Sequence, residues 1–188
     1  MTDAVTDLVP ICALGGADPA SRRIGALMLT ENAGLGLASL ALRRGALAPD
    51  LGFALPGPGG WAEAPSIAAF WTGPDQWMVE FPGRGAEDVA YDLAARAPGC
   101  SVTEQTDGFA CFEIRGPAPA LTALLEKLVN VDTGRFGPGS ATRTGFHHMS
   151  IFVIRRAEDR LAVLGMRSAA GTIWHALVEA AERQEAMA

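Results

Sequence analysis

The feature that most constrains the fold is an order of elements that the sequence repeats three times between residues 67 and 181. Each time, two short apolar strands are followed by a helix. One of these strands, Gln76–Phe81, alternates its side chains with the period of two that is typical of a half-buried strand. Short turns join the strands within each pair, so hairpins dominate the connections. The order therefore predicts an α+β fold with mainly antiparallel sheets and helices packed on one face, and it argues against a doubly wound parallel sheet.

Turn residues and apolar periodicity set the expected bounds. The expected strands are 67–71, 76–81, 101–105, 109–114, 148–154 and 160–164, and the expected helices are 87–97, 117–129 and a last helix that Ser168 caps. Gly73-Pro74-Asp75 is turn chemistry between the first two strands. Asp107-Gly108 is a strong hairpin signal between the next two. Residues 136–145 are expected to form a loop.

The first sixty residues are less clearly patterned. Residues 1–20 are expected to extend over the surface or onto a partner. Ile24–Thr30 is expected to be a strand, and Leu35–Arg44 a short helix that ends at Gly45. The stretch 51–60 is rich in Pro and Gly, which indicates a loop or a connector between subdomains.

Composition leaves two interpretations of the surface. Apolar residues make up 49% of the 188 residues and charged residues 19%, with a mean hydropathy of +0.18. These values fit an Ala- and Gly-rich bacterial protein, and they also fit apolar surface that a partner or a second copy of the chain covers. The net charge is −6 and the arginines are scattered along the chain. We therefore expect no nucleic-acid partner, because such an interface needs a basic face.

Cysteine usage and hydropathy indicate a cytoplasmic protein. Cys12, Cys100 and Cys111 have no metal-ligand spacing and are odd in number, which fits a reducing compartment. Cys111 lies within an apolar strand and is expected to be a small core residue. No apolar run approaches the roughly 18 residues of a membrane span, and the N-terminus lacks a signal-peptide pattern. We expect no membrane partner.

The sequence shows no nucleophile–base pair, no metal quartet and no phosphate-binding loop. Gly34–Ser39 has two glycines of a dinucleotide loop but lacks the third, and no acidic residue closes a second strand about 20 positions on. His147 and His148 are adjacent, and adjacent strand residues point to opposite faces. We expect no catalytic, cofactor-binding or metal-binding residue in this chain.

A few side chains are candidates for contacts with a partner instead. The candidates are Trp61, Trp71, Asp75, Gln76 and Arg143. Trp61 leads because it stands in a Gly/Pro-rich loop, where an aromatic residue has little reason to be buried, and Trp is enriched at binding hot spots. The alternative is that Trp61 is a lid over the core. The polar stretch Thr103–Asp107 is either a solvent-facing edge strand or a ligand-facing one.

Six segments carry a family resemblance. They are GWAEAP, AFWTGPDQWMVE, SVTEQTDGFA, NVDTGRFGPGSATRTG, HMSIFVIRR and SAAGTIWHALVEAA. In this order they resemble the gamma subunit of heterotetrameric sarcosine oxidase, over about residues 23–181. That family is a flavoenzyme complex of alpha, beta, gamma and delta subunits that oxidatively demethylates sarcosine to glycine. Oxygen is the acceptor and gives hydrogen peroxide, and the methyl carbon leaves as formaldehyde or is captured by tetrahydrofolate.

The resemblance implies that the cofactors belong to the other subunits. Flavins and NAD are expected in the alpha and beta subunits and zinc in delta, with no cofactor in this chain. The implied partners are the alpha, beta and delta subunits, and the implied role is non-catalytic, in assembly. A homo-oligomer of the isolated chain is a further expectation.

The strand order after residue 67 also resembles the glycine-cleavage aminomethyltransferase fold, a folate-binding family. It implies two small α+β subdomains. The expected division is an N-terminal extension (1–22), a first subdomain part with the connector (23–60), a central α+β subdomain (61–165), and a C-terminal helix and tail (166–188). The second resemblance leaves an alternative function open, that of a stand-alone folate-binding protein of one-carbon transfer.

Overall fold

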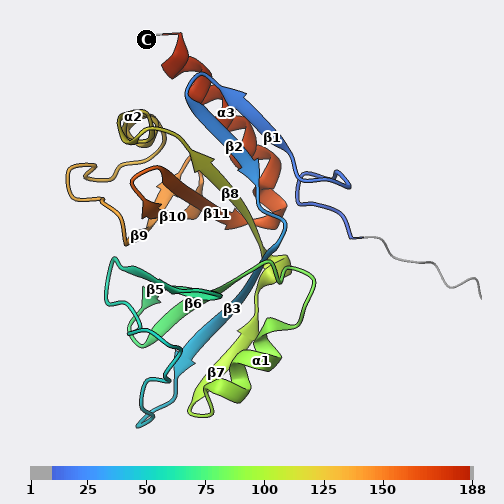
Figure 1. Ribbon diagram of the computed structural model, residues 1–188, viewed down its shortest axis with the longest axis vertical. Coiled ribbons are helices and arrows are strands. Elements are labelled where there is room, and N and C mark those ends of the chain that lie inside the picture. The colour runs from blue at the N-terminus through green and yellow to red at the C-terminus, as the bar shows by residue number, and fades with distance from the viewer. Residues whose placement is uncertain (1–9, 187–188) are drawn as a thin grey trace, which may run out of the picture.

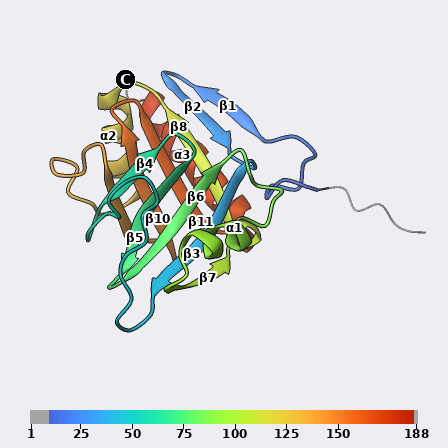
Figure 2. The same cartoon turned by 60° about the horizontal axis from the view of Figure 1, so that its bottom comes forward.

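Two antiparallel β-sheets stacked face to face form the centre of the molecule, as Figures 1 and 2 show. The computed structural model describes residues 10–186. The first sheet has, in spatial order, β1 (Ser21–Ile24), β2 (Leu27–Glu31), β8 (Phe109–Arg115), β11 (Arg160–Met166), β10 (Met149–Ala157) and β9 (Ser140–Phe146). The second sheet has β4 (Trp61–Ala64), β5 (Ile67–Gly73), β6 (Gln76–Pro82), β3 (Leu35–Leu42) and β7 (Cys100–Glu104).

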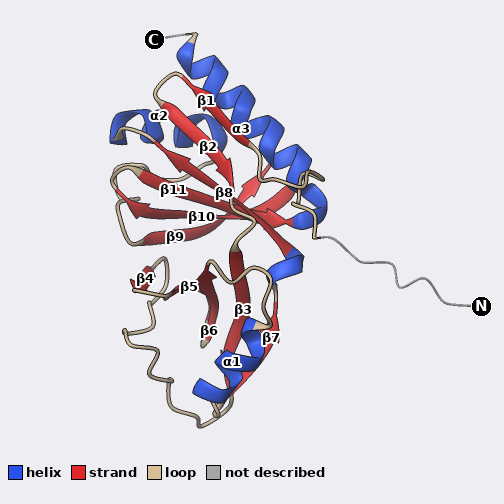
Figure 3. Cartoon of the chain, turned by 45° about the vertical axis from the view of Figure 1, so that its right-hand side comes forward, coloured by secondary structure: helices blue, strands red, loops and turns tan. Residues whose placement is uncertain are grey.

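Helices cover the outer face of each sheet, which gives a four-layered α/β/β/α arrangement (Figure 3). The helices α2 (Ala118–Leu128) and α3 (Ala170–Glu185) pack on the six-stranded sheet, and α1 (Val89–Arg96) packs on the five-stranded sheet. Two short 3₁₀ turns complete the fold, η1 (Thr106–Gly108) and η2 (Arg167–Ala169). Among residues 10–186, no helix is both long enough and apolar enough to span a membrane.

Three apolar layers hold these elements together. The largest lies between the six-stranded sheet and its helices and contains Phe112, Leu124 and Ile173, each fully buried. The second lies between the five-stranded sheet and α1. The third lies between the two sheets, where Phe70 packs against Phe152 with 5.0 Å between ring centroids. Burial of apolar area on both faces of each sheet is the main term that stabilises such a stack.

In the sequence, all strands of the five-stranded sheet lie between two groups of strands that belong to the six-stranded sheet. β1 and β2 begin the six-stranded sheet, β3 to β7 make the whole five-stranded sheet, and β8 to β11 then complete the six-stranded one. Strands β4 to β7 and β8 to β11, which the sequence places together in a central subdomain at 61–165, therefore belong to different sheets. The C-terminal helix α3 packs on the six-stranded sheet.

The α+β class, the antiparallel pairing and the helices outside the sheets are confirmed. The hairpins β5–β6 and β10–β11 form as the turn residues predict. Asp75, in the first of these turns, has a positive φ of 57°, a conformation that Asp adopts more readily than most residues. Helices α1 and α2 lie within about two residues of their expected bounds.

The expected helix over Leu35–Arg44 is wrong, because this segment is strand β3. It is the strand between β6 and β7, and most of its residues are buried on both faces. A strand buried on both faces is apolar almost throughout, so its pattern does not alternate and cannot be distinguished from a short buried helix. Gly45 ends it in a turn, with a φ of +80°.

The expected hairpin around Asp107-Gly108 is also wrong. β7 pairs with β3 in one sheet and β8 pairs with β2 and β11 in the other. The segment between them is η1, in which the Gly108 amide donates to the Gln105 carbonyl at 2.9 Å. The Asp-Gly turn is present, but it carries the chain from one sheet to the other.

Several other elements differ from those that the sequence predicts. The expected single strand Ile24–Thr30 is broken at Gly25, whose φ is +50°, into the hairpin β1–β2. The strands β4 and β9 lie in stretches that the sequence predicts as loops. Ser168 lies within η2, and the residue before α3 is Ala169, which makes no side-chain capping bond.

Candidate functional site

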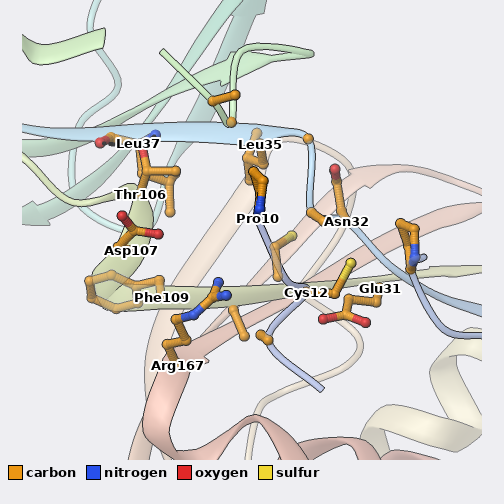
Figure 4. Close-up of a pocket in the computed structure, with 18 of the residues that line it drawn as sticks. Pro10, Cys12, Glu31, Asn32, Leu35, Leu37, Thr106, Asp107, Phe109 and Arg167 are labelled. Carbon is orange, nitrogen blue, oxygen red and sulfur yellow. Dashed lines mark hydrogen bonds between the residues drawn. The ribbon is translucent and has the colours of Figure 1, made fainter. Parts of the chain in front are cut away.

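A cleft of about 380 Å³ opens where the two sheets meet the N-terminal segment (Figure 4). Its walls come from five parts of the chain: residues 10–19, the link from β2 to β3 with the start of β3, the link from β6 to α1, η1 with the start of β8, and η2. The labelled residues that line it are Pro10, Cys12, Glu31, Asn32, Leu35, Leu37, Thr106, Asp107, Phe109 and Arg167. Cavities of about 300 Å³ and more are typical of small-molecule sites.

A buried carboxylate holds the N-terminal wall in place. Glu31, at the end of β2, is only 3% exposed. Its Oε1 accepts from the Leu14 amide at 3.0 Å and its Oε2 accepts from the Ala20 amide at 3.1 Å. Hydrogen bonds to a charged carboxylate are stronger than those between neutral groups. Residues 10–20 thus lie against the chain's own sheet. The expectation for residues 1–9 lies outside the described residues.

Close backbone packing closes another end of the cleft. A Cβ on Gly85 would lie 2.4 Å from the Ala33 carbonyl oxygen and 3.0 Å from the Gly34 carbonyl carbon. The Gly85 amide donates to the Gly34 carbonyl at 3.1 Å. Only glycine allows the β6–α1 link to approach the β2–β3 link this closely.

Two opposite charges line the cleft near Phe109. Arg167 is half-buried, and its Nη2 donates to the Ile11 carbonyl at 2.6 Å. Asp107 is exposed, and its carboxylate makes no hydrogen bond or ion pair within residues 10–186. Figure 4 shows both side chains beside the Phe109 ring. They come from η1 and η2, which follow strands of different sheets.

The thiols of the cleft are not activated. Burial raises the pKa of Cys12, and Glu31 and Asp18 add to the shift. Burial also raises the pKa of Cys111 well above its ordinary value, with a further contribution from Glu113. A thiol must lose its proton to act as a nucleophile or a metal ligand. Within residues 10–186 no three His, Cys, Asp or Glu side chains are placed to hold a metal ion.

A second polar cluster lies between the sheets and includes Trp61. Glu80, on β6, is fully buried. Its Oε1 accepts from Arg156 Nη2 at 2.6 Å, and its Oε2 accepts from Trp61 Nε1 at 2.8 Å. Arg156 comes from β10 of the other sheet, and its Nε lies 3.4 Å from Glu113 Oε1. The cluster therefore joins the two sheets through charged hydrogen bonds.

The electrostatics of this cluster are those of a structural ion pair. Burial raises the pKa of Glu80, opposed by Arg156 and by the Trp61 indole. For Arg156, burial acts to lower the pKa, but attraction to Glu80 and Glu113 outweighs it and raises the pKa. Because both acceptor oxygens of Glu80 are used within the chain, no part of this carboxylate is presented to a ligand.

The expected partner contacts are placed in different environments. Trp61 is 7% exposed on β4, with the Arg156 guanidinium 5.6 Å from its ring, so the lid over the core is the interpretation that the structure favours. Trp71 is half-buried on the five-stranded sheet. Asp75 and Gln76 are exposed at the β5–β6 turn. Arg143 is exposed on β9, where its Nε donates to Ser150 Oγ at 2.8 Å. As partner contacts, these residues stay predictions.

The polar stretch Thr103–Asp107 divides into two parts. Thr103 and Glu104 are exposed on the edge strand β7, and Glu104 accepts from the amides of Ala90 and Thr106 at 3.0 Å. Thr106 and Asp107 line the cleft. Glu31 and Arg167 were not predicted as site residues from the sequence. The three charged residues of the cleft lie far apart in the chain, and no local motif links them.

The stacked antiparallel sheets with outer helices define a folate-binding-like α+β fold, and two solved structures share it. A chain of heterotetrameric sarcosine oxidase from Corynebacterium sp. U-96, in complex with pyrrole 2-carboxylate, matches with a TM-score of 0.70 and 21% identity. The match covers 86% of this chain and 87% of that chain. The glycine cleavage system aminomethyltransferase T from Bartonella henselae matches with a TM-score of 0.57 and 14% identity.

The second match has a different extent. It covers 79% of this chain and 44% of the aminomethyltransferase, so this chain spans less than half of that protein. No protein-family model matches the sequence. No curated protein matches it at a significant level.

Proposed function

We propose that this chain is a non-catalytic subunit of a heteromeric sarcosine oxidase, with a role in assembly. The observation that carries the proposal is the extent of the match to the sarcosine oxidase chain. It covers more than four fifths of both chains, so the two have similar length as well as the same fold. The ordered segments that resemble the gamma subunit support the same role.

In this proposal the chemistry belongs to other subunits. Sarcosine, oxygen and water give glycine, formaldehyde and hydrogen peroxide, and tetrahydrofolate can capture the methyl carbon. Flavins and NAD in the alpha and beta subunits, and zinc in delta, are the cofactors that the proposal requires. This chain contributes a two-sheet body to the complex, and the Glu80–Arg156 ion pair joins its two sheets.

The surface around the cleft supports an assembly role. Ile11 and Met166 are 60% and 62% exposed, and each adjoins the cleft, Ile11 as a lining residue and Met166 as the neighbour of Arg167. Apolar side chains left in solvent at the edge of a cleft offer a surface that another chain can cover. We assign this rim to a contact with the alpha or beta subunit.

Co-expression tests the proposal. A tagged form of this chain should retain the alpha, beta and delta subunits from the same genome through affinity purification and gel filtration, and should do so in fixed proportion. An unrelated tagged chain of similar size controls for adhesion. If alpha and beta assemble and this chain does not co-purify with them, the proposal is wrong.

A second candidate is a stand-alone folate-binding protein of one-carbon transfer, which the aminomethyltransferase match favours. Calorimetric titration of the isolated chain with tetrahydrofolate distinguishes the two. Saturable heat together with failure to join the other subunits would support the second candidate. Absence of heat and of any thermal shift at millimolar ligand would reject it.

A further inference from the structure

The cleft holds one positively and one negatively charged side chain whose hydrogen-bonding groups are not fully used within residues 10–186. Arg167 uses one guanidinium nitrogen, Nη2, to hold the Ile11 carbonyl. Its remaining N–H donors form the flat fork that suits a carboxylate. Asp107 has two carboxylate oxygens without a partner in residues 10–186, and these suit an ammonium group. Although both line one cleft, the two side chains form no ion pair with each other.

The third charged residue of the lining does not compete for a ligand. Both oxygens of Glu31 are occupied by the amides of Leu14 and Ala20. The two cysteines of the lining are neutral, because burial raises the pKa of each. The charges that face the open space are therefore one cation and one anion.

The remaining surface of the cleft is apolar and suits a small organic body. Phe109 is half-buried, with its ring centroid 6.3 Å from that of Phe152. Leu35, Leu37 and Ala110 also line the space. A volume of about 380 Å³ lies near the lower end of ligand cavities, which run to about 1,000 Å³. It suits a ligand the size of a small amino acid with some bridging water.

We propose that this cleft binds a small zwitterion of the α-amino acid class. Its carboxylate lies on Arg167, its ammonium group lies on Asp107, and its carbon body lies against Phe109. The site is a binding site without chemistry of its own. The inference stands on the cleft alone, so it holds or fails independently of the subunit role.

Calorimetry and amide NMR of the isolated full-length chain test it. The probes are sarcosine, glycine and L-proline at about 20 mM, well above a millimolar dissociation constant. Acetate and methylammonium serve as the separate halves of the ligand. At least one zwitterion should bind saturably and at least about 10-fold more tightly than either half, with shifts at Thr106–Ala110 and at Arg167.

Two variants remove one charge each. Arg167→Gln and Asp107→Asn should each weaken binding about 10-fold or more, since each deletes a charge-assisted hydrogen bond. Arg167→Gln also loses the bond to Ile11, whereas Asp107→Asn leaves the N-terminal wall untouched and therefore tests the site without that complication. The matched controls are Arg115→Gln and Asp159→Asn, which make the same changes at exposed positions outside the cleft.

Three results would overturn the proposal. One is no saturable binding of any of the three zwitterions. Another is binding that survives both cleft variants. The last is loss with Arg167→Gln while Asp107→Asn binds like the unaltered chain, because the site would then recognise an anion alone.

Discussion

Replacing Glu80 with alanine should destabilise the protein by about 3–5 kcal/mol. The carboxylate is fully buried and accepts two hydrogen bonds, from Arg156 at 2.6 Å and from Trp61 at 2.8 Å. Its loss leaves the Arg156 guanidinium, whose side chain is 8% exposed, with Glu113 as its remaining acidic neighbour at 3.4 Å. The main cost is the buried Arg156 charge that is left without its partner. Because Glu113 still balances part of that charge, the loss of stability should lie near the lower end of this range.

Equilibrium unfolding in urea measures this loss. The double variant Glu80→Met/Arg156→Met removes both charges and should stay within about 2 kcal/mol of the original protein, because an apolar pair of similar volume avoids the cost of burying ions. The matched control is Glu63→Ala. Glu63 is half-exposed and lies 3.9 Å from Arg160, so its loss should cost less than about 1 kcal/mol.

Two outcomes would refute this reasoning. If Glu80→Ala costs less than about 1 kcal/mol, the buried pair does not join the sheets. If the double variant is as unstable as the single one, the loss comes from packing and not from the unpaired charge.

Three further predictions concern other parts of the fold. Burial acts to raise the pKa of Glu104, but hydrogen bonds from nearby groups lower the pKa overall, so the stability that the Glu104 carboxylate adds is present above about pH 4.5 and is lost as the pH falls through the lowered pKa. The difference in unfolding free energy between the original protein and Glu104→Gln should therefore shrink as the pH falls, and a difference that stays constant would contradict the prediction. Gly85→Ala should cost about 1–3 kcal/mol by urea unfolding because its Cβ would meet the Ala33 carbonyl, whereas Gly137→Ala, where a Cβ meets nothing within 4 Å, should not. Met166→Glu should reduce co-purification of the other subunits without lowering the thermal midpoint of the isolated chain, and unchanged recovery would remove this rim from the interface.

Local chemistry was sufficient to predict much of the fold. The β5–β6 and β10–β11 hairpins follow from turn residues placed between apolar strands, and helix α2 follows from apolar residues at helical spacing. The same signals failed at β3, where burial on both faces removes the alternation that identifies a strand. They failed again at Asp107, because a turn signal predicts a change of direction and not which sheet the next strand joins.

The candidate site required tertiary information. Glu31, Asp107 and Arg167 are separated by more than a hundred residues in total, and they meet because the chain leaves and re-enters the six-stranded sheet. The burial of Trp61 also could not be predicted without tertiary information. The stretch around it is rich in Gly and Pro, which indicates a loop, but its indole donates to Glu80 and lies beside Arg156, and both of these residues are on other strands.

In the proposed role, this chain is a stoichiometric part of a sarcosine oxidase assembly. Native mass spectrometry of the complex purified through a tag on the alpha subunit tests it most directly. We expect an assembly whose mass includes one copy of this 19.6 kDa chain for each alpha subunit, and whose controlled dissociation releases the chain intact. A stable, active complex whose mass is complete without this chain would contradict the proposed role.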